Sequence, residues 1–548
     1  MTFYCQAYFV WETGLQKGSE SSMRKLIVSS LKNIFAFLIF IFAVGFMSLH
    51  VGSFSKIVYA NTESKNDDVN WNIYFFNDYY GEANRGFETG ANEYYFAKDE
   101  NSDVTSFVAS SSGQNSTTPV VETNNYQNKG DPFDKKYPPK FDIRTKEIAI
   151  DLSDQGSSNL CWSFAMVSAI EIGYMLKTSE KIDLSETHFA YSLSSQVSKK
   201  GFNRGVDAAG SFKMGIAYLT RWEGPVLQSV DPYTGDFEKR TEESNMRDNT
   251  LHVQGFQNVS NSYNDVKNAV LEHGSAVTSI YIPSNFSIKT TSSVYNAKTY
   301  GYYNDNNSNI YNHAVLIVGW DNDYPASNFT SHPPINGAWI VKNSWGASAG
   351  DKGYMYVSYA DVNILKDVNC ITNIEKNDNY DKMYMYDTFG ETGSVHFDKQ
   401  EAWFANVFSI GSGEEISAVS FYLPTSDTNY EIYLGEKLTS RKLVAKGNCE
   451  KPGYYTIKLD EPVKLISSTC VAFVKLTKAE GVARISIESN VMGYIQNATA
   501  DKGQSYVSAN GTQWIDIAEK RRDTNVCVRV FTKVIDTKEG ANDKKIAA

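Results

Sequence analysis

Positive charge is in short supply in this sequence. Its 548 residues contain 52 Lys and Arg against 63 Asp and Glu, a formal net charge of −11. The chain shows no basic stripe, no glycine-rich phosphate loop and no Cys/His spacing of the zinc-binding kind, which are the features that hold nucleic acids, nucleotides and structural zinc. We therefore expect no nucleic-acid partner, no metal among the site residues and no required cofactor.

Cysteine is also scarce for a chain of this length. There are six in all, and one of them, Cys5, precedes an apparent export signal. The remaining five are Cys161, Cys370, Cys449, Cys470 and Cys527. An odd number leaves at least one free thiol, which makes a cysteine nucleophile a candidate. The last four are interpreted as structural or incidental, because buried, unreactive cysteine is the commoner state.

Residues 1–60 are predicted to contain a secretory signal that starts at Met23. The apolar run Ile34–Val51 follows basic residues and precedes the small-residue site Val58-Tyr59-Ala60. The alternative is an uncleaved membrane anchor, because about 18 apolar residues can cross a bilayer. We expect a secreted, extracellular protein, either free or associated with the cell surface or wall, that touches a membrane only through this segment.

The rest of the chain divides by composition. Hydrophobic residues make up 42% and aromatic residues 14%, so the bulk is globular, and the length calls for several domains. Residues 61–135 are acidic up to Asp134, with 13 Asp or Glu against four Lys or Arg, and have little periodicity. We interpret them as a propeptide or linker. Residues 136–375 and 376–535 then form two domains, and 536–548 form a tail.

Residues 136–375 change from a helical half to a β half. Cys161–Met175 has apolar residues on most faces and no Gly or Pro before Gly173, which predicts a buried helix that begins at the cysteine. Four strand-like runs follow: Ala276–Ile282, His313–Trp320, Ala338–Lys342 and Tyr354–Tyr359. Beyond 375, short alternating runs separated by turn residues predict an all-β sandwich.

Cys161 is placed where a thiol can become a nucleophile. A helix N-terminus and a neighbouring imidazolium can lower a thiol pKa from about 8.5 to between about 3.5 and 7.5. Gln155 stands six residues earlier on the loop that leads into the helix. Its amide and the Cys161 N–H could both donate to the oxyanion of a tetrahedral intermediate.

A base and its orienting partner can also be named. His313 begins a strongly apolar strand in Asn312-His313-Ala314-Val315, and Asn343 follows in Lys342-Asn343-Ser344-Trp345-Gly346. Asn343 could accept from one ring nitrogen of His313 and fix its tautomer. Trp345 would shield that bond from water.

Together these segments resemble the papain family of cysteine peptidases, in the order Gln, Cys, His, Asn. The resemblance covers about Tyr137 to Asp361 and implies a two-lobed α+β fold, with a helical lobe, a β-barrel-like lobe and the active site between them. It carries Cys161 over as nucleophile, His313 as base and acid, Asn343 as orienter and Gln155 as oxyanion donor. Gly210 would line the cleft and, with Trp345, border the substrate. Ser158 stands where the family usually has a disulfide cysteine.

The C-terminal part resembles the lectin-like domain behind papain-type peptidases of Gram-positive bacteria. Its motifs include Tyr384-Met385-Tyr386-Asp387, Gly453-Tyr454-Tyr455 and Trp514-Ile515-Asp516. Some relatives hold calcium there, so a structural calcium ion is one expectation, although spacing assigns no ligands.

The sequence thus predicts a secreted cysteine endopeptidase, made as a zymogen, that cleaves proteins or peptides through a Cys161 thioester. The alternative is a cell-surface or glycan-binding protein with a weak or inactive protease scaffold. Cell-wall or surface glycans or proteins are further expected partners.

Overall fold

The computed structural model describes residues 129–146, 148, 150–306 and 311–535, together with the backbone of three strands between 74 and 109. All of them fall within one compact unit that begins at Asn66. The expected signal and the tail at 536–548 lie outside the described residues. Among the helices that are described, none is long and apolar enough to cross a membrane.

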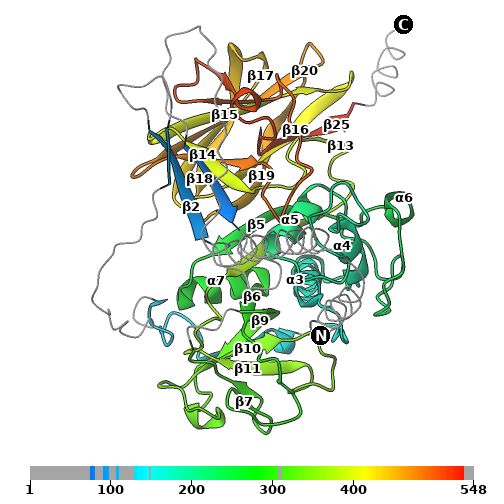
Figure 1. The fold of residues 1–548 in the computed structure, drawn as a ribbon, viewed down its shortest axis with the longest axis vertical. Helices are drawn as coiled ribbons and strands as arrows, with labels where there is room; N and C mark the ends of the chain where they lie inside the picture. Colours follow the sequence, from blue (N-terminus) through cyan, green and yellow to red (C-terminus); the bar gives the residue numbers. More distant parts are fainter. Residues whose placement is uncertain are drawn as a thin grey trace, which may run out of the picture. The chain divides into compact units, whose positions relative to one another are not determined.

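The first lobe of the predicted peptidase is helical. Helix α3 (Cys161–Thr178) begins at the predicted residue and is buried over most of its surface, as its all-round apolar sequence indicates. The other helices are α4 (Glu186–Ser192), α5 (Phe212–Thr220) and the short α6 (Glu242–Asn245). Ser185 and Ser211 cap α4 and α5 by accepting from backbone N–H groups of the first turn. Figure 1 shows α4 and α5 beside α3, with α6 farther out at the right-hand edge of this lobe.

The second lobe is built on four strands joined by three consecutive antiparallel pairings. β9 (His313–Asp321) lies between β6 (Ala276–Ile280) and β10 (Ala338–Lys342), and β10 pairs with β11 (Tyr354–Ser358). All four strands match sequence predictions to within two residues. On the other side, β12 (Val368–Lys376) links β6 to β5 (Leu251–Val259). Helix α7 (Tyr263–His273) packs on this sheet.

The remaining elements of this lobe are short. They are β4 (Lys140–Asp142), the 3-10 turn η2 (Ile143–Lys146), β7 (Tyr295–Asn296), β8 (Gly301–Tyr302) and the 3-10 turn η3 (Ala326–Asn328). The described strands follow an open path from β5 to β7, so the sheet does not close into the expected barrel-like form.

The C-terminal part is all-β, as predicted, apart from the one-turn helix α8 (Ile517–Lys520). Its longer strands are β15 (Glu401–Ser409), β16 (Glu414–Leu423), β17 (Thr428–Lys437), β18 (Ser440–Cys449), β19 (Gly453–Val463), β20 (Thr469–Lys478) and β25 (Val528–Val534). The shorter ones are β13 (Lys382–Tyr384), β14 (Gly393–His396), β21 (Arg484–Glu488), β22 (Ser505–Ser508), β23 (Ile515–Asp516) and β24 (Asn525–Val526).

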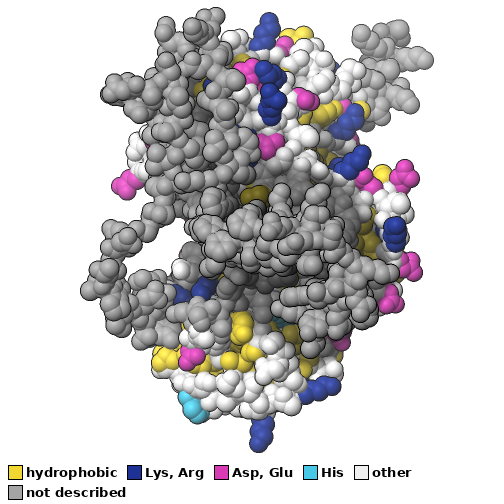
Figure 2. Space-filling model, viewed as in Figure 1, with side chains coloured by type: hydrophobic (Ala, Val, Ile, Leu, Met, Phe, Trp, Pro, Cys, Tyr) yellow, Lys and Arg dark blue, Asp and Glu magenta, His cyan; other side chains and the backbone are white. Residues whose placement is uncertain are grey.

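Apolar side chains of these strands form a core of their own, which includes Phe404, Val419, Phe421 and Val474. On the face drawn in Figure 2, basic and acidic side chains are interspersed over this part of the molecule.

One sheet runs through both parts of the chain, which the sequence does not predict. Tyr454 and Tyr455 of β19 pair with Phe256 and Gly255 of β5, so the strand order continues from β25 through β16, β19 and β5 into the protease lobe. A single hydrophobic core accordingly includes Tyr454 together with residues of α3 and α5. The two domains are therefore joined by main-chain pairing and a shared core.

Part of the segment interpreted as propeptide or linker is also in strands. β1 (Tyr74–Tyr79) pairs with β14, and β2 (Gly90–Ala97) and β3 (Ser106–Ala109) continue the sheet outward. Strand addition of this kind requires only a free sheet edge and an extended backbone, so the weak periodicity of the segment did not reveal it.

Candidate active site

Cys161 is the first residue of α3, and its side chain is partly exposed. Leu160 in the N-cap position makes no side-chain cap, so no side chain competes for the N–H groups of the first turn. The N–H of Ala314 donates to Sγ of Cys161 over 3.4 Å. Burial of the sulfur raises the pKa of the thiol, and backbone N–H groups of Ala314, Trp162 and Cys161 itself act in the opposite direction.

His313 lies at the start of β9, next to Ala314, with its ring held from two sides. Its Nε2 lies 2.8 Å from Oδ1 of Asn343, and its ring stacks on the Trp345 indole with centroids 4.8 Å apart. Because Nε2 donates to the amide oxygen, the neutral ring has its lone pair on Nδ1. Burial lowers the pKa of His313 to about 4, against the Asn343 hydrogen bond, so the imidazole is a neutral base above that pH.

Gln155 is fixed by the segment that carries Asn343. Its Oε1 accepts from Ser344 Oγ at 2.5 Å, and its backbone N–H donates to the Ser344 carbonyl at 2.8 Å. Its Nε2 donates to the Ser158 carbonyl at 2.6 Å, which leaves the second hydrogen of the amide for another acceptor. Ser344 thus couples the orienting residue of His313 to the amide of Gln155.

A small hollow lies beside Trp162 and Ala314, the residues that follow Cys161 and His313 in the chain. It is lined by Trp162, Gly210, Phe212, Ala314 and Asp367, among others. Gly210 packs flat on the Trp162 indole, because a Cβ on Gly210 would lie only 2.4 Å from Cε2 of that ring. The structure therefore brings all six predicted site residues to one region, with Gly210 on the wall of the hollow and Trp345 over the His313–Asn343 bond.

Comparison with known families agrees with this geometry. Residues 137–375 match the papain family cysteine protease domain, and residues 383–532 match the lectin-like domain. Residues 137–375 belong to the papain family. The structure of the cysteine protease and lectin-like domains of Cwp84, a surface layer associated protein of Clostridium difficile, is similar to both parts together. It is 26% identical with a TM-score of 0.66, over 73% of this chain and 89% of that one.

A clostridial Cwp84 structure after propeptide cleavage is similar to a comparable extent, with 26% identity and a TM-score of 0.65 over 72% of this chain and 99% of the other. Vignain of Vigna mungo is 28% identical over 218 residues, 40% of this chain. The cysteine protease of Blomia tropicalis is 29% identical over 289 residues, half of this chain and 75% of its own. The chain spans about half the length of vignain, 53%.

Hydrogen bonds hold the loop around Ser158, the position at which the family resemblance implies a disulfide cysteine. Tyr233 donates to the Gln155 carbonyl at 2.6 Å and lies 2.9 Å from Ser158 Oγ, which itself donates to the Gln155 carbonyl. Asn159 is held through its N–H and side chain by Asp207. The sequence suggested no such role for Tyr233 or Ser344, since neither has a spacing that marks it.

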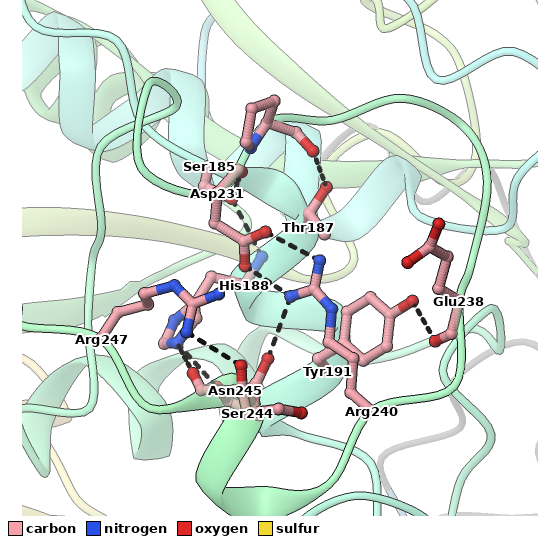
Figure 3. Close-up of polar contacts among 12 residues, drawn as sticks. Ser185, Thr187, His188, Tyr191, Asp231, Glu238, Arg240, Ser244, Asn245 and Arg247 are labelled. Atoms are coloured by element: carbon pink, nitrogen blue, oxygen red, sulfur yellow. Dashed lines mark hydrogen bonds and ion pairs between the residues drawn. The ribbon is translucent and has the colours of Figure 1, made fainter.

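The loop that carries Tyr233 is itself firmly attached to the helical lobe. Asp231 makes two hydrogen bonds with Arg240, at 2.8 and 2.9 Å, and its carbonyl accepts from Ser185 at the N-cap of α4 (Figure 3). The guanidinium of Arg240 lies 3.9 Å from the centre of the Tyr191 ring. His188 of α4 bonds the Asn245 carbonyl through Nε2. These contacts fix the position of the loop from which Tyr233 reaches Gln155.

We expect Tyr233→Phe to lower kcat about 3- to 10-fold with little change in KM, because each lost hydrogen bond is worth about 1 kcal/mol and the oxyanion donor acts mainly in the transition state. Tyr191→Phe is the matched control, since it removes a hydroxyl that donates to the Glu238 carbonyl at 2.7 Å away from Gln155. Steady-state hydrolysis of a peptide substrate measures both. Equal kcat values for the two variants would contradict a role for Tyr233.

The structure gives no support to a particular calcium site. Within the residues that it describes, no three His, Cys, Asp or Glu side chains gather into a group that could hold a metal ion. The expected calcium in the lectin-like domain stays a prediction without assigned ligands.

Proposed function

We propose that the protein is a cysteine endopeptidase with Cys161 as nucleophile and His313 as its general base. The observation that carries this is the joint placement of the two: Nε2 of His313 is bound to Asn343, and the N–H of the next residue, Ala314, is bound to Cys161 Sγ. Nδ1 is then the ring nitrogen that accepts the thiol proton.

Cys161, His313, Gln155 and water together account for every bond and proton of the proposed reaction. Sγ of Cys161 attacks the peptide carbonyl while its proton moves to Nδ1 of His313, and the carbonyl becomes an oxyanion. The Gln155 amide and the Cys161 N–H donate to that oxyanion. The C–N bond then breaks and His313 returns the proton to the leaving amine. Water, deprotonated by His313, hydrolyses the thioester and restores the thiol.

Two further residues complete the proposed site. Trp345 covers the His313–Asn343 hydrogen bond and excludes water from it, which preserves its strength in a low-dielectric setting. Gly210 lets the backbone at the wall of the hollow lie directly against the Trp162 indole, because any side chain there would collide with the ring. We assign Gly210 to substrate binding and Trp345 to the border of the substrate site.

We further propose that the enzyme is exported as a zymogen with residues 61–135 as its propeptide. Support comes from the similarity to Cwp84, described as surface layer associated and known in a form after propeptide cleavage. The apolar segment Ile34–Val51 fits a signal for export. Proteins or peptides are the substrates, and the match of residues 383–532 to a lectin-like domain supports surface glycans as additional ligands, which a glycan array tests.

The proposal is tested with reduced, processed protein and a fluorogenic peptide library. We expect hydrolysis that an epoxide-type thiol-protease inhibitor abolishes with covalent modification of Cys161, located by mass spectrometry. Folded, propeptide-free protein that leaves every peptide intact would instead favour the binding protein with an inactive protease scaffold.

The carboxylate of Asp367 in the lining should give the hollow a preference for basic substrate side chains. Trp162, Phe212 and Ala314 add apolar surface to the lining, which matches the aliphatic part of a Lys or Arg side chain. Burial raises the pKa of Asp367, while a 2.7 Å hydrogen bond from Asn369 and the charge of Lys213 oppose the shift.

We expect Asp367→Asn to lower kcat/KM for Lys- and Arg-containing peptides about 10-fold relative to Leu-containing peptides, since a charged hydrogen bond is worth about 1.5–3 kcal/mol. Because the raised pKa leaves more of the carboxyl protonated in mild acid, the preference of the wild type for basic residues should grow as pH rises. The same library, read position by position at several pH values, measures both effects. A parallel loss for basic and apolar peptides would refute the assignment.

A further inference from the structure

One wall of the hollow beside Trp162 is a loop, residues 201–211, that leads into α5. Gly210 and Ser211 line the hollow, and Gly210 rests on the Trp162 indole next to the nucleophile. Ser211 also caps α5, because its hydroxyl accepts from the Met214 N–H at 3.2 Å. A displacement of Ser211 therefore moves both the lining of the hollow and the start of α5.

The far side of this loop is supported by the lectin-like domain. The Tyr494 hydroxyl lies 3.3 Å from Ser211 Oγ in a buried position, and the Tyr494 carbonyl accepts from the Asn203 N–H at 2.9 Å. The Tyr494 ring lies 5.0 Å from that of Phe202. Asn203 Nδ2 reaches the Gly493 carbonyl at 3.3 Å. Tyr494 therefore contacts the loop near its start, at Phe202 and Asn203, and at its end, at Ser211.

The segment that presents Tyr494 is closed on itself and anchored in the lectin-like domain. The side chain of Asn490 makes two hydrogen bonds with Ala498. Its Nδ2 donates to the Ala498 carbonyl at 3.1 Å, and its Oδ1 accepts from the Ala498 N–H at 2.8 Å. Arg521 donates to the Asn490 carbonyl at 2.9 Å. Val491 and Ile495 form a bridge across the turn. This closed turn holds Tyr494 in a fixed position relative to the lectin-like domain, next to Ser211.

We propose that Tyr494 of the lectin-like domain is a positioning residue for the protease, which holds the Ser211 wall of the hollow in the form that binds substrate. The inference rests on the proposed peptidase function. The lectin-like domain then contributes directly to substrate affinity, whatever else it binds. Because Tyr494 contacts the Ser211 wall of the hollow, its effect should fall on KM and leave the chemistry intact.

The test compares Tyr494→Phe with Tyr386→Phe in the full, processed protein. The control also removes one tyrosine hydroxyl, which is part-buried and donates to the Val407 carbonyl at 2.6 Å inside the lectin-like domain. We expect Tyr494→Phe to raise KM about 5-fold with kcat nearly unchanged, and Tyr386→Phe to change neither. Alkylation of Cys161 by iodoacetamide, which is too small to need the wall, should proceed at the wild-type rate in both.

Ser211→Ala completes a double-mutant cycle with Tyr494→Phe. If the Ser211–Tyr494 contact carries the effect, the double variant has the KM of Ser211→Ala alone. Equal KM for Tyr494→Phe and Tyr386→Phe, or a matching fall in the iodoacetamide rate, would overturn the proposal. If the wild-type protein hydrolyses no peptide, the proposed peptidase function fails, and this result alone does not decide the role of Tyr494. The wall is then tested by inactivation of Cys161 with a peptidyl epoxide, which Tyr494→Phe should slow about 5-fold relative to iodoacetamide; an unchanged ratio would overturn the inference.

Discussion

Cys161→Ala is expected to lower kcat/KM for peptide hydrolysis by about 10⁴- to 10⁶-fold, the loss typical of removing the nucleophile from a catalytic unit. Alanine keeps the helix start and the packing of Trp162 while it removes the only atom that can form the thioester. The part-buried hydrogen bond from the Ala314 N–H to Sγ is lost as well. Peptide hydrolysis by processed protein, with circular dichroism to verify folding, measures the effect.

Cys449→Ala is the matched control for this loss. Cys449 is a free cysteine like Cys161, but it is buried in the lectin-like domain, and burial raises the pKa of its thiol to about 12. A protonated thiol is a poor nucleophile, so Cys449→Ala should retain wild-type activity. Hydrolysis that survives Cys161→Ala at more than about 1% would contradict the proposed mechanism.

Arg529→Leu is expected to reduce the free energy of unfolding by about 3–5 kcal/mol, because it leaves a buried carboxylate without its partner. Arg529 and Asp387 are 1% and 0% exposed, and the guanidinium makes three hydrogen bonds of 2.8–3.1 Å to the carboxylate. Its Nη1 also donates to the Thr220 carbonyl at the end of α5, at 2.7 Å. The ion pair therefore joins the lectin-like strands to the helical lobe, and its loss should loosen both. Urea denaturation followed by tryptophan fluorescence measures the change.

Two further variants give this prediction its controls. Arg529→Leu/Asp387→Leu removes both charges and should recover part of the lost stability, as replacement of a buried pair by apolar groups often does. Lys502→Ala breaks the solvent-exposed pair with Glu519 and should leave the urea midpoint unchanged. A midpoint for Arg529→Leu close to that of Lys502→Ala would show that the buried pair contributes nothing.

The catalytic centre is the part of the molecule that the sequence predicts best. Cys161, His313 and Asn343 each stand at the start or the end of a regular element whose apolar pattern is strong, so both the element and the orientation of its terminus follow from local sequence. The strand at Ala338–Lys342 was predicted with its observed bounds for the same reason. Family resemblance adds Gly210, which lies on the wall of the hollow, and its role in substrate binding stays a prediction.

The contacts that support this centre were not predictable in the same way. Tyr233 and Tyr494 reach Gln155 and Ser211 across 78 and 283 positions of the chain. Nothing in the local sequence of a tyrosine tells which distant carbonyl or hydroxyl it will meet. The continuous sheet escaped prediction for a related reason, since pairing between β5 and β19 is decided by which sheet edges come together during folding.

One run with a uniform strand-like pattern is divided between two strands of different sheets. Val526–Phe531 has the short alternating pattern of a single strand, but the chain divides it into β24 and β25. At the division, the Cys527 N–H donates to the Ser486 carbonyl of β21 at 3.1 Å. The chain thereby changes from one sheet to the other within two residues, a corner that alternation of side chains does not reveal.

The junction of β5 with β19 also determines how this protein can be divided. A fragment that ended near residue 375 would leave the outer edge of β5 from Gly255 to Asn258 without the hydrogen bonds it makes to Pro452–Tyr455, and the complementary fragment would expose the same edge of β19. Unpaired edges of this kind associate with other chains. The boundary that separates the two families in the sequence is thus a poor place to cut the polypeptide, and we expect the peptidase and its lectin-like neighbour to unfold together.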